Sequence, residues 1–256
     1  MRFLVLKKKT VLFVFMIIVC FSLLSTKIYG TPVASIYFGN APRLIPIYNV
    51  STEEKKVAIT FDSAWGADKT EKIIQTLKDY NVNATFFLCG FWVEEYPEMV
   101  KLIDESGIEI GTHSNTHPDL TTLDNESITL ELSTSCELIK NITQKDVNLF
   151  RAPFGAYNNT LINIAESMNI KTIQWDVDTL DWKGLSGVEI CERVMSRVNN
   201  GSIILCHNNS DHILEALPLM LERLINAGYE VVSVGELIYW ENYYIDHAGV
   251  QHLNSD

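Results

Sequence analysis

Apolar and polar positions alternate in blocks along the chain between residues 55 and 240. Short and almost continuously apolar runs such as ATFFL and SIILC predict buried strands, because the strands of a parallel sheet are covered on both faces. The segments between these runs carry apolar residues three or four positions apart, which is typical of helices with one buried face. Residues 69–80 show this spacing, with Ile73, Ile74 and Leu77 on the same side.

The alternation predicts seven strand–helix units. The predicted strands are residues 57–61, 84–88, 108–111, 148–150, 172–175, 202–205 and 230–234. The predicted helices are residues 69–80, 94–105, 125–140, 159–168, 188–198 and 213–227, with a last one in 235–240. Such units build either a barrel or an open doubly wound sheet. Because no Rossmann or P-loop glycine fingerprint follows the first strand, we predict an α/β barrel with fewer than eight strands.

The first 30 residues predict an export signal. Lys7, Lys8 and Lys9 precede the apolar run VLFVFMIIVCFSLL, whose 14 residues suit a signal peptide and are short for a free-standing membrane helix. No A-x-A-like cleavage triplet follows, so residues 1–30 are interpreted as a signal peptide or an uncleaved membrane anchor. In both cases the body is exported, and is secreted or anchored to the outer face of the cytoplasmic membrane. Residues 31–54 are interpreted as a lead-in without a clear period, and residues 241–256 as a C-terminal tail.

Charge argues against a nucleic-acid partner. The chain has 20 Lys and Arg against 32 Asp and Glu, a net charge of −12, and five of the basic residues lie within the first 30. The body is therefore still more acidic than the whole chain. Such a surface has no basic stripe to displace counterions from phosphates.

Reactive residues concentrate at the carboxyl ends of the predicted strands, where barrel active sites are assembled. They are Asp62 in TFD, His113 and His117 in HSNTH, Arg151 in RAPFG, Asp178 and Asp181 in DVDTLDW, and His207 in ILCH. If the turn holding His113 and His117 is helical, both imidazoles project to one side and share a metal ion.

The ordered motifs TFD, HSNTH, RAPFG, DTLDW and ILCH resemble the polysaccharide deacetylase family, also called the NodB-homology or carbohydrate esterase 4 family, over residues 55–240. The resemblance implies a distorted (β/α)7 barrel and a metal-dependent hydrolase that removes N-acetyl groups from an amino-sugar polymer. TFD-x-x-WG and DWKG resemble the sporulation-type peptidoglycan deacetylases. Together with the export signal, this implies that the substrate is peptidoglycan of the cell wall or spore cortex.

The resemblance also implies a metal-binding half of the site. His113 and His117 would hold a divalent metal, usually zinc, which polarises the acetamide carbonyl. Asp62 would be the general base that takes a proton from the attacking water, and Arg151 would orient Asp62 and tune its charge.

The remaining roles concern the transition state and the leaving group. The backbone N–H of Phe154 would help bind the oxyanion. His207 would protonate the departing amine, with Asp181 keeping it charged and oriented, and Trp182 would line the pocket. Trp65 and Trp92 follow the first two strands, where they either form a sugar-stacking platform or pack into the core.

One position departs from the family pattern. Ser63 stands where the second aspartate of TFDDG is the third metal ligand, and serine is a neutral, weak ligand. Three outcomes follow: two histidines and water hold the metal with reduced affinity, Asp68 substitutes as the nearest downstream carboxylate, or the protein is a catalytically weakened glycan-binding module. Retention of Asp62, His207, Arg151 and Asp181 favours activity. Besides a deacetylase and a glycan-binding module, a third hypothesis for the function is an amidase that acts on a small molecule. Such an enzyme needs long loops that close the pocket.

Overall fold

The computed structural model describes Met16 and residues 42–254. Apart from Met16, the predicted signal or anchor and the first part of the lead-in lie outside these residues. From Leu44 onward the described chain forms one compact unit. Within the described part, no helix is long and apolar enough to cross a membrane.

The helices and strands follow one another along the chain as the alternation predicts. The helices are α3 (Thr70–Asp79), α4 (Gly90–Glu95), α5 (Pro97–Glu105), α6 (Asn125–Thr143), α7 (Asn159–Ser167), α8 (Gly187–Met195), α9 (Ile213–Asn226) and α10 (Val234–Leu237). The strands are β1 (Asn49–Val50), β2 (Lys56–Ser63), β3 (Thr85–Leu88), β4 (Glu109–Thr112), β5 (Leu149–Phe150), β6 (Lys171–Thr172), β7 (Val177–Asp178), β8 (Ile203–His207), β9 (Glu230–Val232), β10 (Tyr243–Ile245) and β11 (Val250–Leu253).

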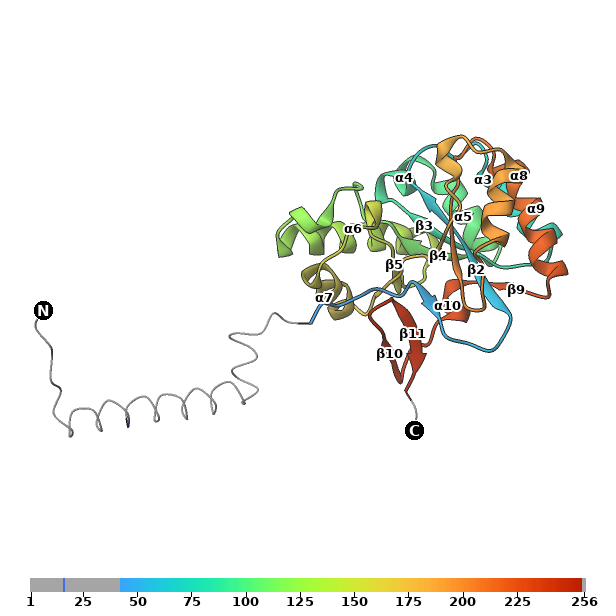
Figure 1. Cartoon of the computed structure of the whole chain (residues 1–256). Coiled ribbons are helices and arrows are strands. Elements are labelled where there is room, and N and C mark those ends of the chain that lie inside the picture. Colours follow the sequence, from blue (N-terminus) through green and yellow to red (C-terminus); the bar gives the residue numbers. More distant parts are fainter. Residues whose placement is uncertain (1–15, 17–41, 255–256) are drawn as a thin grey trace, which may run out of the picture. The chain divides into compact units, whose positions relative to one another are not determined.

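The main sheet has the strand order β6-β5-β4-β3-β2-β8-β7, and β9 also pairs with β2. Every one of these pairs is parallel. The sheet curls into a half-barrel with helices along its outside, and α8 and α9 lie side by side (Figure 1). The predicted distorted barrel is confirmed, and all strand ends that carry reactive residues meet at one edge.

Strand β2 shows how the alternation positions the site. Val57, Ile59 and Phe61 belong to the apolar layer between sheet and helices. Thr60 and Asp62 project to the inner side, where both accept hydrogen bonds from one guanidinium. Because successive side chains of a strand point to opposite faces, the apolar outer positions force Asp62 into the mouth of the half-barrel.

Two predicted elements differ in the structure. The helix predicted for residues 94–105 is two helices, because Pro97 occupies the first position of α5 and cannot continue α4. The strand predicted for residues 172–175 is only β6, and the chain enters the sheet again as β7. Strands β6 and β7 are therefore the two edges of the sheet and do not pair with each other.

The lead-in, which has no clear period in the sequence, and the C-terminal tail contain short strands in their described residues. Strands β1, β11 and β10 form a second, three-stranded sheet. The backbone N–H of Ile47 donates to Thr172 at 3.0 Å, and that of Val50 donates to Gly201 at 3.0 Å. The lead-in thus connects the β6 edge to the start of β8. Strands of two to four residues are too short to show a period in the sequence.

Candidate active site

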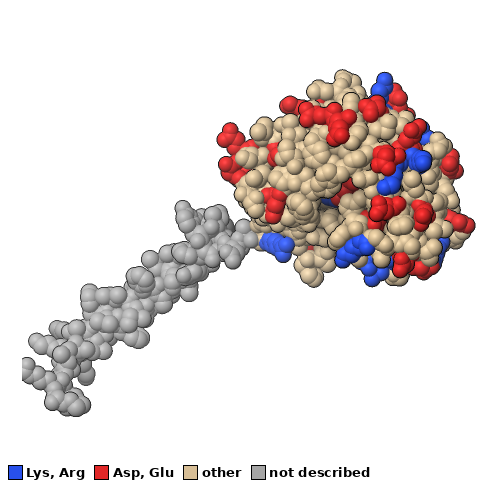
Figure 2. Space-filling view, turned by 90° about the horizontal axis from the view of Figure 1, so that it is seen from above, with Lys and Arg blue, Asp and Glu red and all other residues tan. Residues whose placement is uncertain are grey.

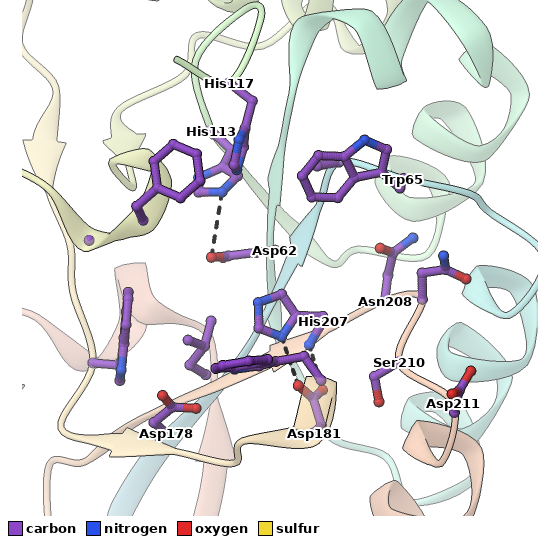
Figure 3. A pocket seen from close by; sticks show the side chains of 17 residues that line it. Asp62, Trp65, His113, His117, Asp178, Asp181, His207, Asn208, Ser210 and Asp211 are labelled. Carbon is purple, nitrogen blue, oxygen red and sulfur yellow. Dashed lines mark hydrogen bonds and ion pairs between the residues drawn. The ribbon is translucent and has the colours of Figure 1, made fainter. Parts of the chain in front are cut away.

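A cavity of about 720 Å³ opens at the carboxyl ends of the strands (Figure 3). The predicted site residues that line it are Asp62, His113, His117, Phe154, Asp178, Asp181, Trp182 and His207. They come from five separate strand ends and the loops that follow. The convergence expected from the strand order is therefore present, although no two of these motifs are adjacent in sequence.

Asp62 and Arg151 form a buried ion pair at the base of the cavity. Arg151 is fully buried, and its Nη1 donates to Asp62 Oδ1 at 2.8 Å and to Thr60 Oγ1 at 2.7 Å. Its guanidinium lies 4.3 Å from the centre of the Phe87 ring. Burial raises the pKa of Asp62, but the opposing effects, of which the charge of Arg151 is the largest, leave that pKa below its ordinary value. The carboxylate is therefore ionised at neutral pH.

His207 and Asp181 form a second pair on the other side of the cavity. Asp181 is 1% exposed and accepts two hydrogen bonds from His207, from Nδ1 at 2.7 Å and from the backbone N–H at 2.8 Å. Burial lowers the pKa of His207, but the hydrogen bond and the charge of Asp181 raise it. The net result is a pKa above the ordinary value of histidine. Asp178 instead accepts from the backbone N–H of Leu180, so Asp181 is the partner of the histidine.

His113 and His117 come together without a helical turn. Residues 113–119 contain no helix, and Ser114 and His117 have left-handed backbone angles, with φ of 69° and 60°. The ring centres nevertheless lie 4.9 Å apart. The two imidazoles therefore meet although the condition of a helical turn is not fulfilled. Left-handed non-glycine residues are unfavourable and collect at functional sites.

Hydrogen bonds hold this strained loop in place. Glu131 of α6 accepts from the backbone N–H groups of Asn115 and Thr116, at 2.9 and 2.8 Å. The Ser114 hydroxyl accepts from the backbone N–H of His117 at 3.1 Å. Glycine at position 90 leaves room for this loop, because a Cβ there would lie 2.0 Å from Asn115 Oδ1 and would displace that side chain. The loop is thus shaped by α6 and by the start of α4.

Both imidazoles are in a state that suits a metal ligand. His113 Nδ1 lies 2.8 Å from the carbonyl oxygen of Arg151, so the hydrogen on Nδ1 leaves the Nε2 lone pair free. Nε2 lies 3.7 Å from Asp62 Oδ2. Burial lowers the pKa of both histidines, that of His117 to about 4. Neutral imidazole is the metal-binding form.

Cys89 completes a group of three potential metal ligands within the described residues. The ligand atoms of Cys89, His113 and His117 all lie within 4.8 Å of one another. Ser63 is fully buried, and its hydroxyl has no hydrogen-bond partner in this part of the chain. Asp68 is exposed and does not line the cavity. The structure therefore does not bring this proposed substitute to the histidines.

Three exposed aromatic side chains surround the cavity. Trp65, Phe154 and Trp182 are 63%, 71% and 60% exposed. Trp65 and Phe154 flank the His117 imidazole edge-on, with ring centres 5.0 and 4.8 Å away. Trp92 instead belongs to the core, and its indole N–H donates to the carbonyl of Gly66 at 2.8 Å. Of the two tryptophans, Trp65 therefore faces the site, where sugar rings can stack, and Trp92 packs into the core.

Several residues of the site were not among those predicted from the sequence. Thr60 could have been found, because it lies two positions before Asp62 on the same face of β2. Trp175, which lines the cavity, follows a strand end as well. Cys89 comes directly after β3 but belongs to no recognised motif. Its place beside the histidines becomes visible only where the end of β3 contacts the histidine loop.

Acidic side chains are spread over the visible face of the body, and basic side chains are interspersed without forming a stripe (Figure 2). This distribution agrees with the excess of 32 acidic over 20 basic residues in the chain. A polyanionic ligand finds no continuous positive surface on this face.

Comparison with known proteins places these features in a family. Residues 49–173 match the family model described as polysaccharide deacetylase. The uncharacterised protein YlxY of Bacillus subtilis is 34% identical over 193 residues, which are 75% of this chain and 60% of YlxY. The peptidoglycan-N-acetylmuramic acid deacetylase PdaA of Bacillus subtilis is 32% identical over 196 residues, 75% of this chain and 74% of PdaA. The chain thus spans less than two thirds of the length of YlxY.

A solved structure extends the comparison. BA3943 of Bacillus anthracis, described as a pseudoenzyme of the CE4 family, matches with a TM-score of 0.74 and 34% identity, over 84% of this chain and 74% of BA3943. A BA3943 mutant with restored enzymatic activity matches with a TM-score of 0.73 and 37% identity, over 78% of this chain and 72% of the mutant.

Proposed function

Since the chain belongs to the polysaccharide deacetylase family, we propose that it is a metal-dependent hydrolase that removes N-acetyl groups from peptidoglycan. One observation carries this proposal: an ionised carboxylate paired with Arg151 and a histidine paired with Asp181 line the same cavity (Figure 3). A base and an acid whose environments shift their pKa values in opposite directions are what amide hydrolysis needs.

The residues of the cavity divide the reaction between them. Asp62 accepts a proton from the water that attacks the acetamide carbonyl, and Arg151 keeps this carboxylate ionised and fixed. His207 donates its Nε2 proton to the departing amine, while Asp181 holds its Nδ1. Acetate and a free amino sugar result. The Phe154 backbone N–H, at a left-handed residue in the cavity wall, is proposed to stabilise the oxyanion.

A divalent cation fits beside these groups. Two neutral imidazoles and a thiol within reach of each other are a donor set that suits zinc. When bound, the cation supplies Lewis acidity to the acetamide carbonyl and to the attacking water. The donor set favours zinc over magnesium or calcium, which prefer oxygen ligands.

Exposed aromatic side chains in the cavity wall support a polymer substrate. Exposed Trp65 and Trp182 offer flat apolar surfaces on which sugar rings stack. The deacetylase PdaA supports peptidoglycan as the polymer, and the charged-then-apolar N-terminus supports export. We therefore propose that the protein acts outside the cytoplasm, secreted or anchored to the outer face of the membrane, with wall or spore-cortex peptidoglycan as its partner.

A second candidate function is a glycan-binding protein without catalysis. Ser63 in place of the expected aspartate favours it, and so does the similarity to the pseudoenzyme BA3943. This candidate keeps the aromatic surface but predicts weak metal binding and no acetate release.

Acetate release decides between the two functions. The full chain, purified in mild detergent and stripped of metal, is titrated with zinc by calorimetry and incubated with N-acetylglucosamine oligomers and with peptidoglycan. We expect zinc-dependent acetate release that Asp62→Asn or His207→Ala each lowers by about 10²–10⁴-fold. His212→Ala is the matched control, because the half-exposed His212 side chain pairs with Glu215 and does not line the cavity. Glycan binding without zinc binding or acetate release would establish the second candidate.

A further inference from the structure

Ser63 leaves the two histidines without the carboxylate expected beside them, yet a different side chain lies in reach. Among the described residues only one group of three metal-ligating side chains is found, and its third member is Cys89. The Cys89 backbone N–H donates to the carbonyl oxygen of Ser63 at 3.0 Å. The cysteine therefore follows β3 directly beside the position that lost its ligand.

We propose that the Cys89 thiolate is the third protein ligand of the metal and replaces the carboxylate missing at position 63. This inference rests on the proposed function only in so far as that function requires a metal. It gives the site Cys-His-His ligation with a position left for water and substrate, as in catalytic zinc centres.

The charge balance supports this ligand. The exchange of aspartate for serine removes one negative charge from the site, and a thiolate restores it. Thiolate is the form of cysteine that binds metal, so the Sγ proton leaves to solvent on binding. The negative charge of the thiolate then takes the place of the carboxylate charge that is absent at position 63. Ser63 is a poorer candidate, because it is neutral in either case.

The surroundings of Cys89 favour a ligand over a reactive thiol. Cys89 is fully buried, does not line the cavity, and donates its Sγ hydrogen to the carbonyl oxygen of His113 at 3.4 Å. Tetrahedral zinc places ligand atoms roughly 3.3–3.6 Å apart by its usual bond lengths. His117 is half-buried and lies on a loop, so it is the ligand that can move by the remaining distance.

The buried Ser63 hydroxyl is an independent sign that a metal-bound group belongs at this site. Buried hydroxyl groups almost always have a hydrogen-bond partner, and the Ser63 oxygen has none among the described residues. A water that completes the coordination of a metal held by Cys89 would give this hydroxyl its partner.

Cobalt(II) tests the ligand directly, because sulfur bound to cobalt gives a charge-transfer band in the near ultraviolet that nitrogen and oxygen ligands do not. The metal-free full chain in detergent is titrated with cobalt and followed by absorption and calorimetry, beside Cys89→Ser, Cys191→Ser and Cys89→Ser/Ser63→Asp. Cys191 is the matched control, since it is buried in α8 away from the cavity. Circular dichroism verifies that each variant is folded.

We expect the sulfur band in the unchanged chain and in Cys191→Ser. Cys89→Ser should lose the band and bind cobalt at least about tenfold more weakly, the lower limit for disturbing a ligand set. Adding Ser63→Asp should restore affinity without the band. Cobalt binding without the band, or equal affinity in Cys89→Ser, would overturn the proposal. So would a chain that binds cobalt only after Ser63→Asp.

Acetate release, measured in the same samples with zinc, separates this inference from the proposed function. The band without acetate release would retain Cys89 as a ligand and reject the deacetylase. Acetate release without the band would retain the deacetylase and reject Cys89.

Discussion

At the residue scale, the site is built from two carboxylates with different partners. Asp62 is paired with an arginine that is always charged, and Asp181 with a histidine whose charge depends on pH. The first pairing keeps a base unprotonated, and the second keeps an acid protonated. Neither carboxylate can take the other's role, because the neighbours and not the residue type decide the protonation state.

Asp181 should set the upper pH limit of activity. Catalysis needs protonated His207, so kcat/KM should fall as pH rises through the His207 pKa, which lies above its ordinary value. Asp181→Asn removes the main group that raises this pKa, and the fall should move to lower pH. The measurement is the pH profile of zinc-dependent acetate release. Asp178→Asn, whose carboxylate is not bonded to His207, should give a smaller shift; equal shifts in the two variants would refute the pairing.

Arg151 should be needed for stability as well as for catalysis. Arg151→Met leaves the Asp62 carboxylate buried without its counter-charge, which should lower the free energy of unfolding by about 3–5 kcal/mol. Urea unfolding at neutral pH measures this. Arg223→Met is the control, because Arg223 pairs with Glu192 on the surface and such pairs contribute about 0–1 kcal/mol. A similar loss in both variants would show that the buried Asp62–Arg151 pair contributes no more to stability than a surface pair.

At the element scale, the loops after the strands carry the strain of the site. Ser114, His117, Phe154 and Leu180 all have left-handed backbone angles and lie in or beside the cavity wall. The loop after β2 is fixed through one carbonyl: Gly66 accepts from the Trp92 indole at 2.8 Å and from the Asn208 side chain at 2.9 Å. This places Trp65 at the cavity mouth.

Gly66→Ala should therefore damage both stability and glycan binding. Gly66 has φ of +65°, and an added Cβ would lie 3.2 Å from the Asn209 side chain. The left-handed angle alone should cost about 1–2 kcal/mol of unfolding free energy, and the contact should displace Trp65. Gly107→Ala is the matched control, since Gly107 has φ of +74° with nothing within 4 Å of its Cβ. In urea unfolding, Gly107→Ala should lose as much stability as Gly66→Ala or less. In glycan titration, Gly107→Ala should bind with unchanged affinity.

At the scale of the whole molecule, segments from the two ends of the body complete the half-barrel. Strand β11 pairs in parallel with β1 and antiparallel with β10. Figure 1 shows the β10–β11 hairpin at the end of the molecule opposite α3 and α4. The gap between the two edges of the main sheet is thus reinforced on the side remote from the catalytic residues.

Gln251 should anchor this second sheet. It is fully buried, and its side-chain amide accepts from the Tyr239 N–H at 2.9 Å and donates to the Tyr239 carbonyl at 2.6 Å. Gln251→Ala leaves both backbone groups unpaired and should lower the free energy of unfolding by about 1–3 kcal/mol. Urea unfolding compares it with Gln75→Ala, whose amide bonds Asp79 on the surface and which should change little. Acetate release per folded molecule should be unaffected by either change.

The sequence by itself determined the strand–helix alternation and the residues that end each strand. Apolar runs and helical spacing are local patterns that can be read from the sequence. Parallel strands bring their carboxyl ends to one edge of the sheet, independently of the conformation of the loops. Asp62, Arg151 and His207 could therefore be assigned to one site without a structure. The motifs that carry them resemble one family in order and spacing, which the comparisons confirm.

The tertiary structure alone decided how those side chains pair. That Asp181 and not Asp178 holds His207, that Trp65 faces the cavity while Trp92 is buried, and that the histidine loop is not helical all depend on loop geometry. The approach of Cys89 to the histidines depends on how β3 meets a loop 24 residues further along. Such contacts join segments distant in sequence, and no local period records them, because twist, strand register and loop strain are settled only when the whole sheet forms.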